Sequence, residues 1–425
     1  MKYDLIIIGA GAAGLFAAAN VPAGLKVLVL EKTGKPGQKL LLTGNGQCNL
    51  TNAEPISEFL NRYGNNGKKL RPVLFPFSNS ALIDYFEKNS LPLKTREDGK
   101  IFPASGKSSD VLAFLLNKCK KNGVEIKYNS PVTELIKKDI KNKNETSNKN
   151  NVSDKNNNEP YKYLIKTSSQ TYETKNVLVA TGGASYPQTG SDGEFFSCLE
   201  RFGIELIPCR PALTPIFIKN YPYKNQSGLA VLNTTVTIMQ KNSGKTVKSI
   251  ESLLLTHKGF SGPVILNLSG YITPGDSISI NFMTGKNSTE MRKEFIESAK
   301  GNSVQINTLL SSIANLPRGL SKQICRNVDI AAGEKASRLS GHEMGCLAER
   351  ITNDTHEISE VGGYSVAMTT TGGVSLDEIN LHTTEAKNHP GLFFAGEVLD
   401  VNGDTGGYNI QFAFSSAISA VRNIG

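Results

Sequence analysis

A short run near the amino terminus has the residue types and spacing of a phosphate-binding turn. Gly9-Ala10-Gly11-Ala12-Ala13-Gly14 fits G-x-G-x-x-G, directly after an apolar run and at the start of a helix-forming segment. Gly9 permits a tight turn, Gly11 lets the backbone approach a pyrophosphate, and Gly14 allows close packing of helix on strand. The N–H groups that open the helix would face the phosphates. We expect an adenine dinucleotide here, with Ala12 and Ala13 among its contacts.

An acidic residue follows the turn at the distance that a ribose contact requires. Glu31 stands at the end of a second apolar run, about twenty residues after the glycines, where a carboxylate can accept both ribose hydroxyls. Its negative charge also disfavours a 2′-phosphate. The neighbouring Lys32 is a further candidate contact.

Three later segments favour FAD over NAD. The first, residues 34–52, is rich in glycines and small polar residues, which let the backbone lie against a flat cofactor. The second is an apolar strand that ends in Ala180-Thr181-Gly182-Gly183. The third joins Gly396-Glu397 to a turn that opens the last helix, whose positive end would face the flavin pyrimidine, where reduction builds negative charge. The candidate cofactor contacts beyond residue 32 are Lys39, Leu40, Thr43, Gly44, Asn49, Val132, Thr181, Gly182, Gly183, Gly396, Glu397, Asp404, Gly406, Gly407, Tyr408 and Asn409.

Two residues are candidates for acid–base chemistry. His257 follows a strand in a glycine-containing loop, and its near-neutral intrinsic pKa suits proton transfer, with a structural hydrogen bond as the alternative. Tyr408 begins the last helix and could donate a proton to substrate or simply pack. Cys48 has no partner cysteine nearby, so we interpret it as a packing residue. No metal site is expected, because no second His or Cys lies at ligand spacing from His257.

The elements that position these residues alternate as in an α/β fold. Residues 5–8 and 26–30 have the apolar pattern of parallel strands, joined by a helix over 14–20 in a βαβ unit. Between residues 139 and 160 almost nothing is apolar, which predicts a loop between two strands. Helices are expected over 81–88 and 109–121, and strands over 124–128, 163–167 and 176–180.

After about residue 191 the pattern changes. Strand-like segments over 214–218, 234–239, 249–255 and 277–282 indicate a small antiparallel sheet or barrel. Residues 288–352 are mostly helical, open with a Ser-Thr-Glu cap and break at Pro317. Apolar strands return from Tyr364, and 409–421 is a closing helix. The predicted fold is α/β: a Rossmann-type FAD-binding domain, 1–192 and 362–425, interrupted by an inserted β-barrel-plus-helices domain, 193–361.

The composition indicates which partners and which location to expect. The 425 residues carry a formal net charge of +9, but no run concentrates the basic residues on one predicted face. We therefore interpret them as a solvated surface and expect no nucleic-acid partner. Six cysteines without a C-x-x-C pair favour a reducing, cytoplasmic location. No apolar stretch reaches the length of about 18 residues that a membrane span needs. The oligomeric state stays open.

Longer motifs carry a family resemblance. They are KLLLTGNGQCNLTN at 39–52, FPAS at 102–105, THKGFSGP at 256–263, TGGV at 371–374, AGEVLD at 395–400 and TGGYN at 405–409. With these motifs the chain resembles the BaiN-type NAD(P)/FAD-dependent oxidoreductases, some of which are aminoacetone-oxidase-like. The resemblance implies a two-domain flavoprotein with a β-rich insert and non-covalent FAD. Gln47 stands where this pattern has a basic residue, so a contact there would use a neutral amide.

The expected activity is hydride transfer from NAD(P)H through FAD to a small organic acceptor, and the resemblance implies reduction of a double bond. NAD(P)H would bind transiently, because the sequence has no second G-x-G-x-x-G. Two alternatives remain. One is an oxidase of an amine or aminoketone, and the other is a flavin-containing RNA-modifying or RNA-binding protein, which the +9 charge suggests.

Overall fold

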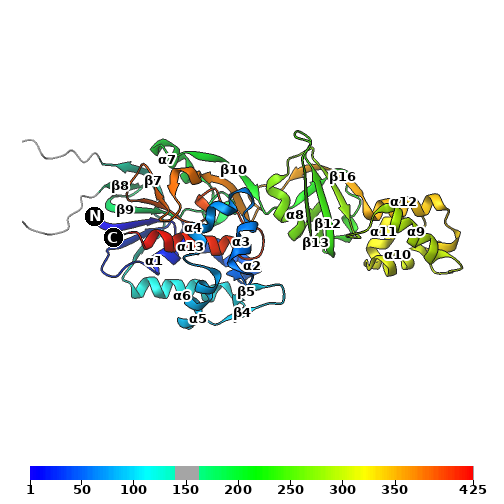
Figure 1. The fold of residues 1–425 in the computed structure, drawn as a ribbon. Helices are drawn as coiled ribbons and strands as arrows, with labels where there is room; N and C mark the ends of the chain where they lie inside the picture. The colour runs from blue at the N-terminus through cyan, green and yellow to red at the C-terminus, as the bar shows by residue number, and fades with distance from the viewer. Residues whose placement is uncertain (139–161, 425) are drawn as a thin grey trace, which may run out of the picture. The chain divides into compact units, whose positions relative to one another are not determined.

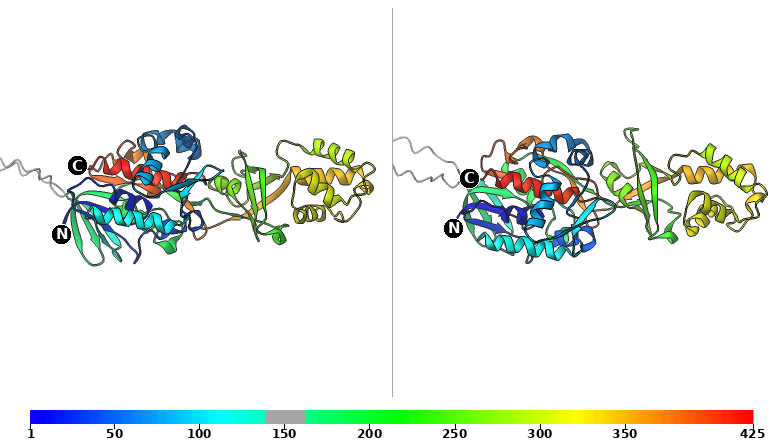
Figure 2. Two further views of the ribbon diagram at one scale, coloured as in Figure 1. Left: turned by 90° about the horizontal axis from the view of Figure 1, so that it is seen from below. Right: turned by 60° about the horizontal axis from the view of Figure 1, so that its bottom comes forward.

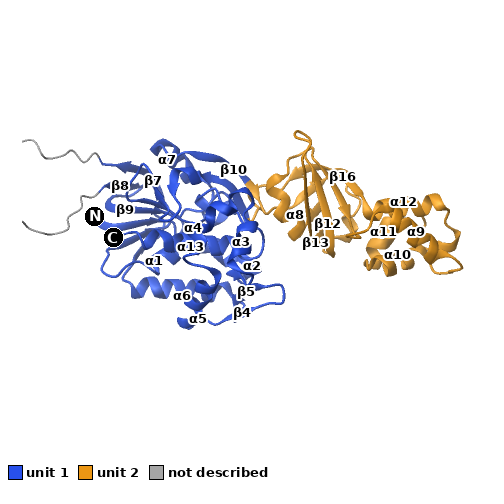
Figure 3. Ribbon diagram, viewed as in Figure 1, with its two compact units in different colours: residues 1–210, 369–425 blue, residues 211–368 orange. Residues whose placement is uncertain are grey.

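The computed structural model describes residues 1–138 and 162–424, so the loop predicted over 139–160 lies outside the described residues. The chain forms two compact units (Figure 3), Met1–Arg210 with Thr369–Gly425 and Pro211–Met368. Sequence analysis places the start of the insert at 193, before helix α7 (Glu194–Phe202). That helix stays with the first unit because its Cys198 and Leu199 are buried in the same apolar cluster as strand residues of that unit.

A parallel sheet forms the centre of the first unit. β1 (Lys2–Ile8) lies between β2 (Val27–Leu30) and β9 (Thr171–Val179). β6 (Glu125–Lys127) adjoins β2, and β20 (Leu392–Phe394) adjoins β9, all in parallel. Every side chain of β2 is buried, as a strand covered on both faces requires.

Two helices from opposite ends of the chain pack together on this sheet (Figures 1 and 2). α1 (Ala12–Ala18) and α13 (Tyr408–Val421) meet through Phe16 and Phe414, whose buried rings stack with centroids 4.2 Å apart. α6 (Ser108–Lys121) contributes Leu115 and Cys119 to the same core. The last strand and helix thus complete the domain that the first residues begin, which confirms the interrupted Rossmann-type fold.

Smaller elements surround this sheet. β7 (Val132–Lys137) and β8 (Tyr163–Thr167) extend it in antiparallel fashion beside β9. A separate three-stranded sheet has the order β3 (Thr51–Asn52), β5 (Lys100–Pro103), β4 (Leu93–Thr95). β18 (Ile379–Asn380) and β19 (Glu385–Ala386) continue the central sheet beside β20 in antiparallel fashion. The other elements of this unit are α2 (Gln38–Gly46), α3 (Ile56–Phe59), α4 (Arg71–Leu74), α5 (Asn79–Lys88), β10 (Leu206–Ala212) and β17 (Thr369–Val374).

The second unit contains the predicted barrel. Six strands close it in the order β11 (Ile216–Ile218), β14 (Gly259–Ser261), β13 (Thr246–Leu255), β12 (Ala230–Met239), β15 (Ser277–Asn281) and β16 (Asp354–Val361). Sequence analysis missed β16. Only Asp354 and Ile358 of that strand are buried, so its sequence lacks an apolar pattern.

Helices fill the rest of this unit: α8 (Pro263–Leu268), α9 (Ser288–Ala299), α10 (Ile306–Ala314), α11 (Arg318–Arg326) and α12 (Gly341–Thr352). The cap of α9 is Asn287, which forms a capping box with Glu290, one residue before the predicted start of the cap motif. α11 begins directly after Pro317, where a break is predicted. Barrel and helices share one apolar core.

Candidate cofactor site

Four neighbouring strands of the central sheet end at one edge. Ile8 pairs with Leu30 and Val179, and Val179 pairs with Phe394. The next residues continue this contact, since Gly9 N donates to Leu30 O at 2.8 Å and Ala395 N donates to Val179 O at 3.0 Å. The glycine turn, Glu31, residues 181–183 and Gly396 therefore gather at the carboxyl edge, where α/β folds bind ligands.

The three glycines of the turn meet different constraints. A Cβ on Gly9, whose φ is +101°, would lie 2.5 Å from Ala180 O, and one on Gly14 would lie 2.0 Å from Gly9 O. A Cβ on Gly11 would meet nothing within 4 Å. Two glycines are thus required by packing, and the third leaves open space before the turn, as a pyrophosphate needs.

Glu31 is 8% exposed and already partly engaged. Its Oε2 accepts from Ala10 N and its Oε1 from Thr33 N and Oγ1, each at 2.8 Å. A carboxylate has about four acceptor positions, so room for a ribose hydroxyl remains. Val132 lies two residues after Ser130, whose N donates to Glu31 O at 2.8 Å.

Lys32 has acidic partners of its own. Its ammonium hydrogen-bonds to Asp192 and Glu194. Burial acts to lower the pKa of Lys32, but the hydrogen bonds that its ammonium donates to these two carboxylates raise it above its ordinary value. The lysine therefore joins residues 192–194 to the end of β2, and a phosphate would have to compete with two carboxylates for it.

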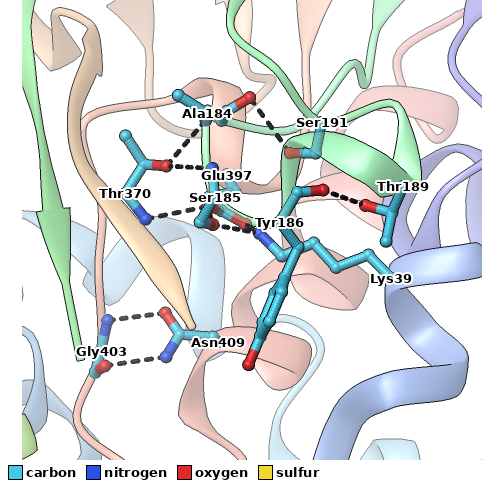
Figure 4. A network of polar contacts seen from close by, with 11 residues as sticks. Lys39, Ala184, Ser185, Tyr186, Thr189, Ser191, Thr370, Glu397, Gly403 and Asn409 are labelled. Atoms are coloured by element: carbon cyan, nitrogen blue, oxygen red, sulfur yellow. Dashed lines mark hydrogen bonds and ion pairs between the residues drawn. The ribbon is translucent and has the colours of Figure 1, made fainter. Parts of the chain in front are cut away.

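Glu397 connects four segments (Figure 4). Its Oε2 lies 2.6 Å from Lys39 Nζ of α2, and its Oε1 accepts from Ser185 Oγ at 2.8 Å and Thr370 N at 2.9 Å. Lys39 also donates to Ser185 Oγ. A Cβ on Gly183 would lie 2.8 Å from Glu397 Oε1, so a glycine is needed there. We call Lys39, Ser185, Thr370 and Glu397 the Glu397 network.

The segment after α2's first turn bends through left-handed conformations. Gly44, Asn45, Gly46 and Cys48 have φ between +55° and +79°. A Cβ on Gly44 would lie 2.9 Å from Asn49 N. Buried atoms without a hydrogen-bond partner among the described residues include Asn49 Oδ1 and Thr51 Oγ1. Orphaned polar atoms of this kind call for a ligand or water, and they fit FAD.

The same segment touches the start of α13. A Cβ on Gly407, at φ +100°, would lie 2.6 Å from Thr51 O. Asn409 closes the turn before the helix by pairing with both backbone groups of Gly403 at 2.8 Å (Figure 4). In the same turn Asp404 N donates to Arg62 O at 2.9 Å. Gly406 has φ +133°, which favours glycine. The structure therefore brings the first and third predicted segments together.

Gln47 has a basic neighbour that sequence reasoning did not assign to it. The Arg96 guanidinium donates to Gln47 Oε1 and lies 3.9 Å above the Phe102 ring. Position 47 is neutral, but a stacked guanidinium stands beside it. Long-range contacts of this kind leave no local pattern in a sequence.

The predicted catalytic residues occupy different surroundings. Tyr408 is 3% exposed, and its ring packs edge-on against Phe59 with centroids 4.9 Å apart. Burial, and then a hydrogen bond to Glu54, raise the pKa of Tyr408. His257 is exposed, in the loop between β13 and β14 of the second unit.

Tyr186 is a candidate that sequence reasoning missed. It follows Ser185 in the turn after β9 and adopts φ +54°, ψ +59°. A bulky residue in this region is strained, and such strain concentrates at functional sites. Figure 4 shows its ring and hydroxyl projecting away from the turn that carries Ser185.

Cys48 should be chemically silent. It is fully buried, and burial raises the pKa of its thiol to about 12. Since only the thiolate reacts, we expect iodoacetamide at pH 8 to label the partly exposed Cys346 and to leave Cys48 unmodified. Peptide mass mapping of the native protein would show this. Rapid labelling of Cys48 with loss of flavin would contradict the packing interpretation.

The described residues contain neither a candidate membrane-spanning helix nor a candidate metal cluster. No helix within 1–138 and 162–424 combines the length and apolar character of a membrane span. In the same ranges no group of three or more His, Cys, Asp or Glu side chains is arranged to hold a metal ion.

Comparison with known proteins identifies the family. The model for the HI0933-like protein Rossmann domain matches residues 3–423. "Ribosomal RNA dihydrouridine synthase" of Haemophilus influenzae is 32% identical over 423 residues, 99% of this chain and 98% of that protein. "3-dehydro-bile acid delta(4,6)-reductase" of Clostridium scindens is 26% identical over 428 residues, 98% of this chain and 97% of that protein.

A solved structure shares the fold. That of 3-ketosteroid delta1-dehydrogenase from Sterolibacterium denitrificans is 12% identical, has a TM-score of 0.52, and is matched over 100% of this chain and 99% of that chain. This likeness concerns the fold alone. The family match, over nearly the whole length, is the stronger finding, and the chain belongs to the HI0933-like Rossmann-domain family of flavin-dependent oxidoreductases.

Proposed function

We propose that this protein is an FAD-dependent reductase that converts uridine to dihydrouridine in ribosomal RNA. The observation that carries the proposal is the full-length similarity, at 32% identity, to a relative with that activity in its name. Sequence analysis ranked a small organic acceptor first and nucleic acid as unlikely. The similarity supports an RNA substrate in this proposal, and the net charge of +9 suits an anionic substrate.

The residues at the carboxyl edge have distinct roles in this proposal. Gly9, Gly11 and Gly14 admit the pyrophosphate of FAD, and Glu31 accepts a ribose hydroxyl. The Glu397 network would hold the segments that border the flavin portion of FAD, and the start of α13 would stabilise the negative charge that reduction builds there. FAD, when bound, supplies the hydride, which it receives from NAD(P)H as a transient co-substrate.

Reduction of the uracil double bond consumes one hydride and one proton. We assign the proton donor to Tyr186, because its strained backbone holds a phenol out of the turn beside the Glu397 network. Tyr408, buried against Phe59, supports the start of α13 instead. His257, in the second unit, stays a prediction.

A Tyr186→Phe variant should lower turnover of RNA by about 10²-fold, the scale of general acid catalysis. FAD content and the rate of flavin reduction by NAD(P)H should not change. Tyr408→Phe is the matched control and should keep full turnover. Stopped-flow absorbance separates the two half-reactions, and equal turnover in both variants would remove Tyr186 from the chemistry.

A small conjugated ketone is the second candidate substrate, as the BaiN-type resemblance implies. The observation in its favour is the 26% identity to the bile acid delta(4,6)-reductase over 98% of this chain. Both names describe loss of a carbon–carbon double bond, so the same flavin half-reaction would serve either substrate.

The test begins with an anaerobic titration of the purified protein by NADH and NADPH. Bleaching of the flavin band by either donor is expected. The reduced enzyme is then mixed with unmodified ribosomal RNA transcribed in vitro or with a 3-keto-delta(4,6) steroid, and dihydrouridine is sought by mass spectrometry. Reoxidation by the steroid alone would sink the RNA proposal. Bleaching by neither donor would sink the nicotinamide step.

A further inference from the structure

Helix α11 carries three basic side chains on one face. Arg318, Lys322 and Arg326 follow at intervals of four residues, and all three are exposed. Residues four apart on a helix lie one above the other. With a rise of about 1.5 Å per residue, neighbouring members are about 6 Å apart along the axis. We call these three residues the α11 basic row.

The opposite face of α11 anchors the helix. Leu320 and Ile324 are each 0% exposed and belong to the core that the barrel and helices share. The basic row is thus held on a fixed element and turned to solvent. The fixed helix sets the spacing of the three side chains before a ligand binds.

The basic row has no acidic partner. α11 contains no Asp or Glu, and within 1–138 and 162–424 none of its three cations forms an ion pair or a side-chain hydrogen bond. Helix α9 of the same unit differs, because its two basic residues lie among Glu290, Glu294 and Glu297. Mixed charges are typical of a solvated helix face, whereas α11 presents one sign only.

Folding does not account for this arrangement. Like charges four residues apart repel and weaken a helix. Arg318 also stands at the positive end of the helix dipole, where a cation is unfavourable. The residue before it, Pro317, provides no side-chain cap. A polyanion bound along the row would relieve all three costs.

We propose that the α11 basic row binds the phosphate backbone of the RNA substrate. This inference rests on the proposed function and names the surface through which the second unit would hold the RNA. Nucleic acid offers repeated negative charges along one path, which matches cations spaced evenly along a helix. Arg318 and Arg326 suit phosphate because a guanidinium can donate two hydrogen bonds at once. Such contacts position RNA without reading its sequence.

The experiment compares two triple variants of the full chain. Arg318→Gln/Lys322→Gln/Arg326→Gln removes the row. Lys68→Gln/Lys120→Gln/Lys121→Gln removes three exposed lysines of the first unit and gives the same change of net charge. Affinity for unmodified ribosomal RNA transcribed in vitro is measured from 0.05 to 0.3 M salt, on the order of the range over which such binding changes steeply.

The row variant should bind RNA at least about tenfold more weakly at 0.1 M salt, with a slope of log affinity against log salt lower by about 2 to 3. The control should keep affinity and slope. In both, FAD content and reduction by NAD(P)H should match the wild type. The thermal midpoint of the row variant should not fall, because charge repulsion is removed. In turnover assays of the row variant, KM for RNA should rise, while kcat at saturating RNA should not change.

Each other outcome overturns the inference in a distinguishable way. Equal loss in both variants would show a general effect of net charge. An unchanged slope in a row variant that still forms dihydrouridine would reject the row and leave the proposed function standing. A wild type that neither binds nor modifies RNA would reject both. A row variant that keeps RNA affinity but loses binding to phosphatidylglycerol vesicles would assign the surface to a membrane.

Discussion

A Gly11→Val variant should fold normally and purify without FAD. The backbone of Gly11 has φ −82° and ψ −166°, which any residue adopts, and its Cβ would meet nothing within 4 Å. The added isopropyl group would occupy the space that the pyrophosphate needs. We expect the dissociation constant for FAD to rise at least about 100-fold, a loss of about 2.7 kcal/mol.

Flavin absorbance per mole of protein and a fluorescence titration of the apoprotein with FAD would measure this effect. The thermal midpoint of the apoprotein should equal that of wild-type apoprotein. Gly14→Ala provides the contrast: its Cβ would lie 2.0 Å from Gly9 O, so both stability and FAD binding should suffer. Gly363→Ala, in open space with an ordinary φ, should change neither. A yellow Gly11→Val protein would show that the cofactor does not lie against Gly11.

The glycine turn shows what sequence can predict in this fold. Gly9, Gly11, Gly14 and Glu31 are close in the chain, so a short βαβ pattern determines their arrangement. Parallel strands also end at one edge by necessity, which relates residues 181–183 and 396 to the turn. The fold class follows from the same local patterns.

The Glu397 network could not be predicted from such local patterns. Ser185 and Thr370 bond the same carboxylate from segments far apart in the chain. Their neighbours, Gly182-Gly183 and Thr371-Gly372-Gly373, were recognised by their glycines. The polar residues beside those glycines have ordinary types, and only the folded chain shows that they converge on Glu397.

Elements with polar surfaces are also hard to predict from the sequence. β16 was missed because two of its eight residues face inward and one of these is Asp354. The α11 basic row was missed because its members are four apart, so no run of basic residues appears. The helix expected after Pro317 already places residues four apart on one face, so this row could have been found from the sequence. The interpretation of the basic residues as scattered is therefore wrong for α11.

A Glu397→Gln variant should lose both stability and FAD affinity. The amide keeps one oxygen for Ser185 and Thr370 but turns N–H groups toward Lys39, whose ammonium now lies 2.6 Å from Glu397 Oε2. Lys39 and Glu397 are 21% and 20% exposed, so water screens the loss only partly. We expect unfolding free energy to fall by about 1–3 kcal/mol, less than the full cost of breaking a buried pair. FAD should dissociate about tenfold more readily, since the pair joins α2 to the turn after β20.

A double-mutant cycle with Lys39→Met isolates the pair. The double variant should be less destabilised than the sum of the single variants by about 1–2 kcal/mol, because removing both partners leaves no unpaired charge. Asp84→Asn is the matched control: Asp84 and Lys88 form an ion pair at 2.8 Å with side chains 62% and 74% exposed. That change should cost no more than about 0.5 kcal/mol. Denaturant titration of the apoprotein supplies these values, and strict additivity would show that Glu397 acts through Ser185 and Thr370 alone.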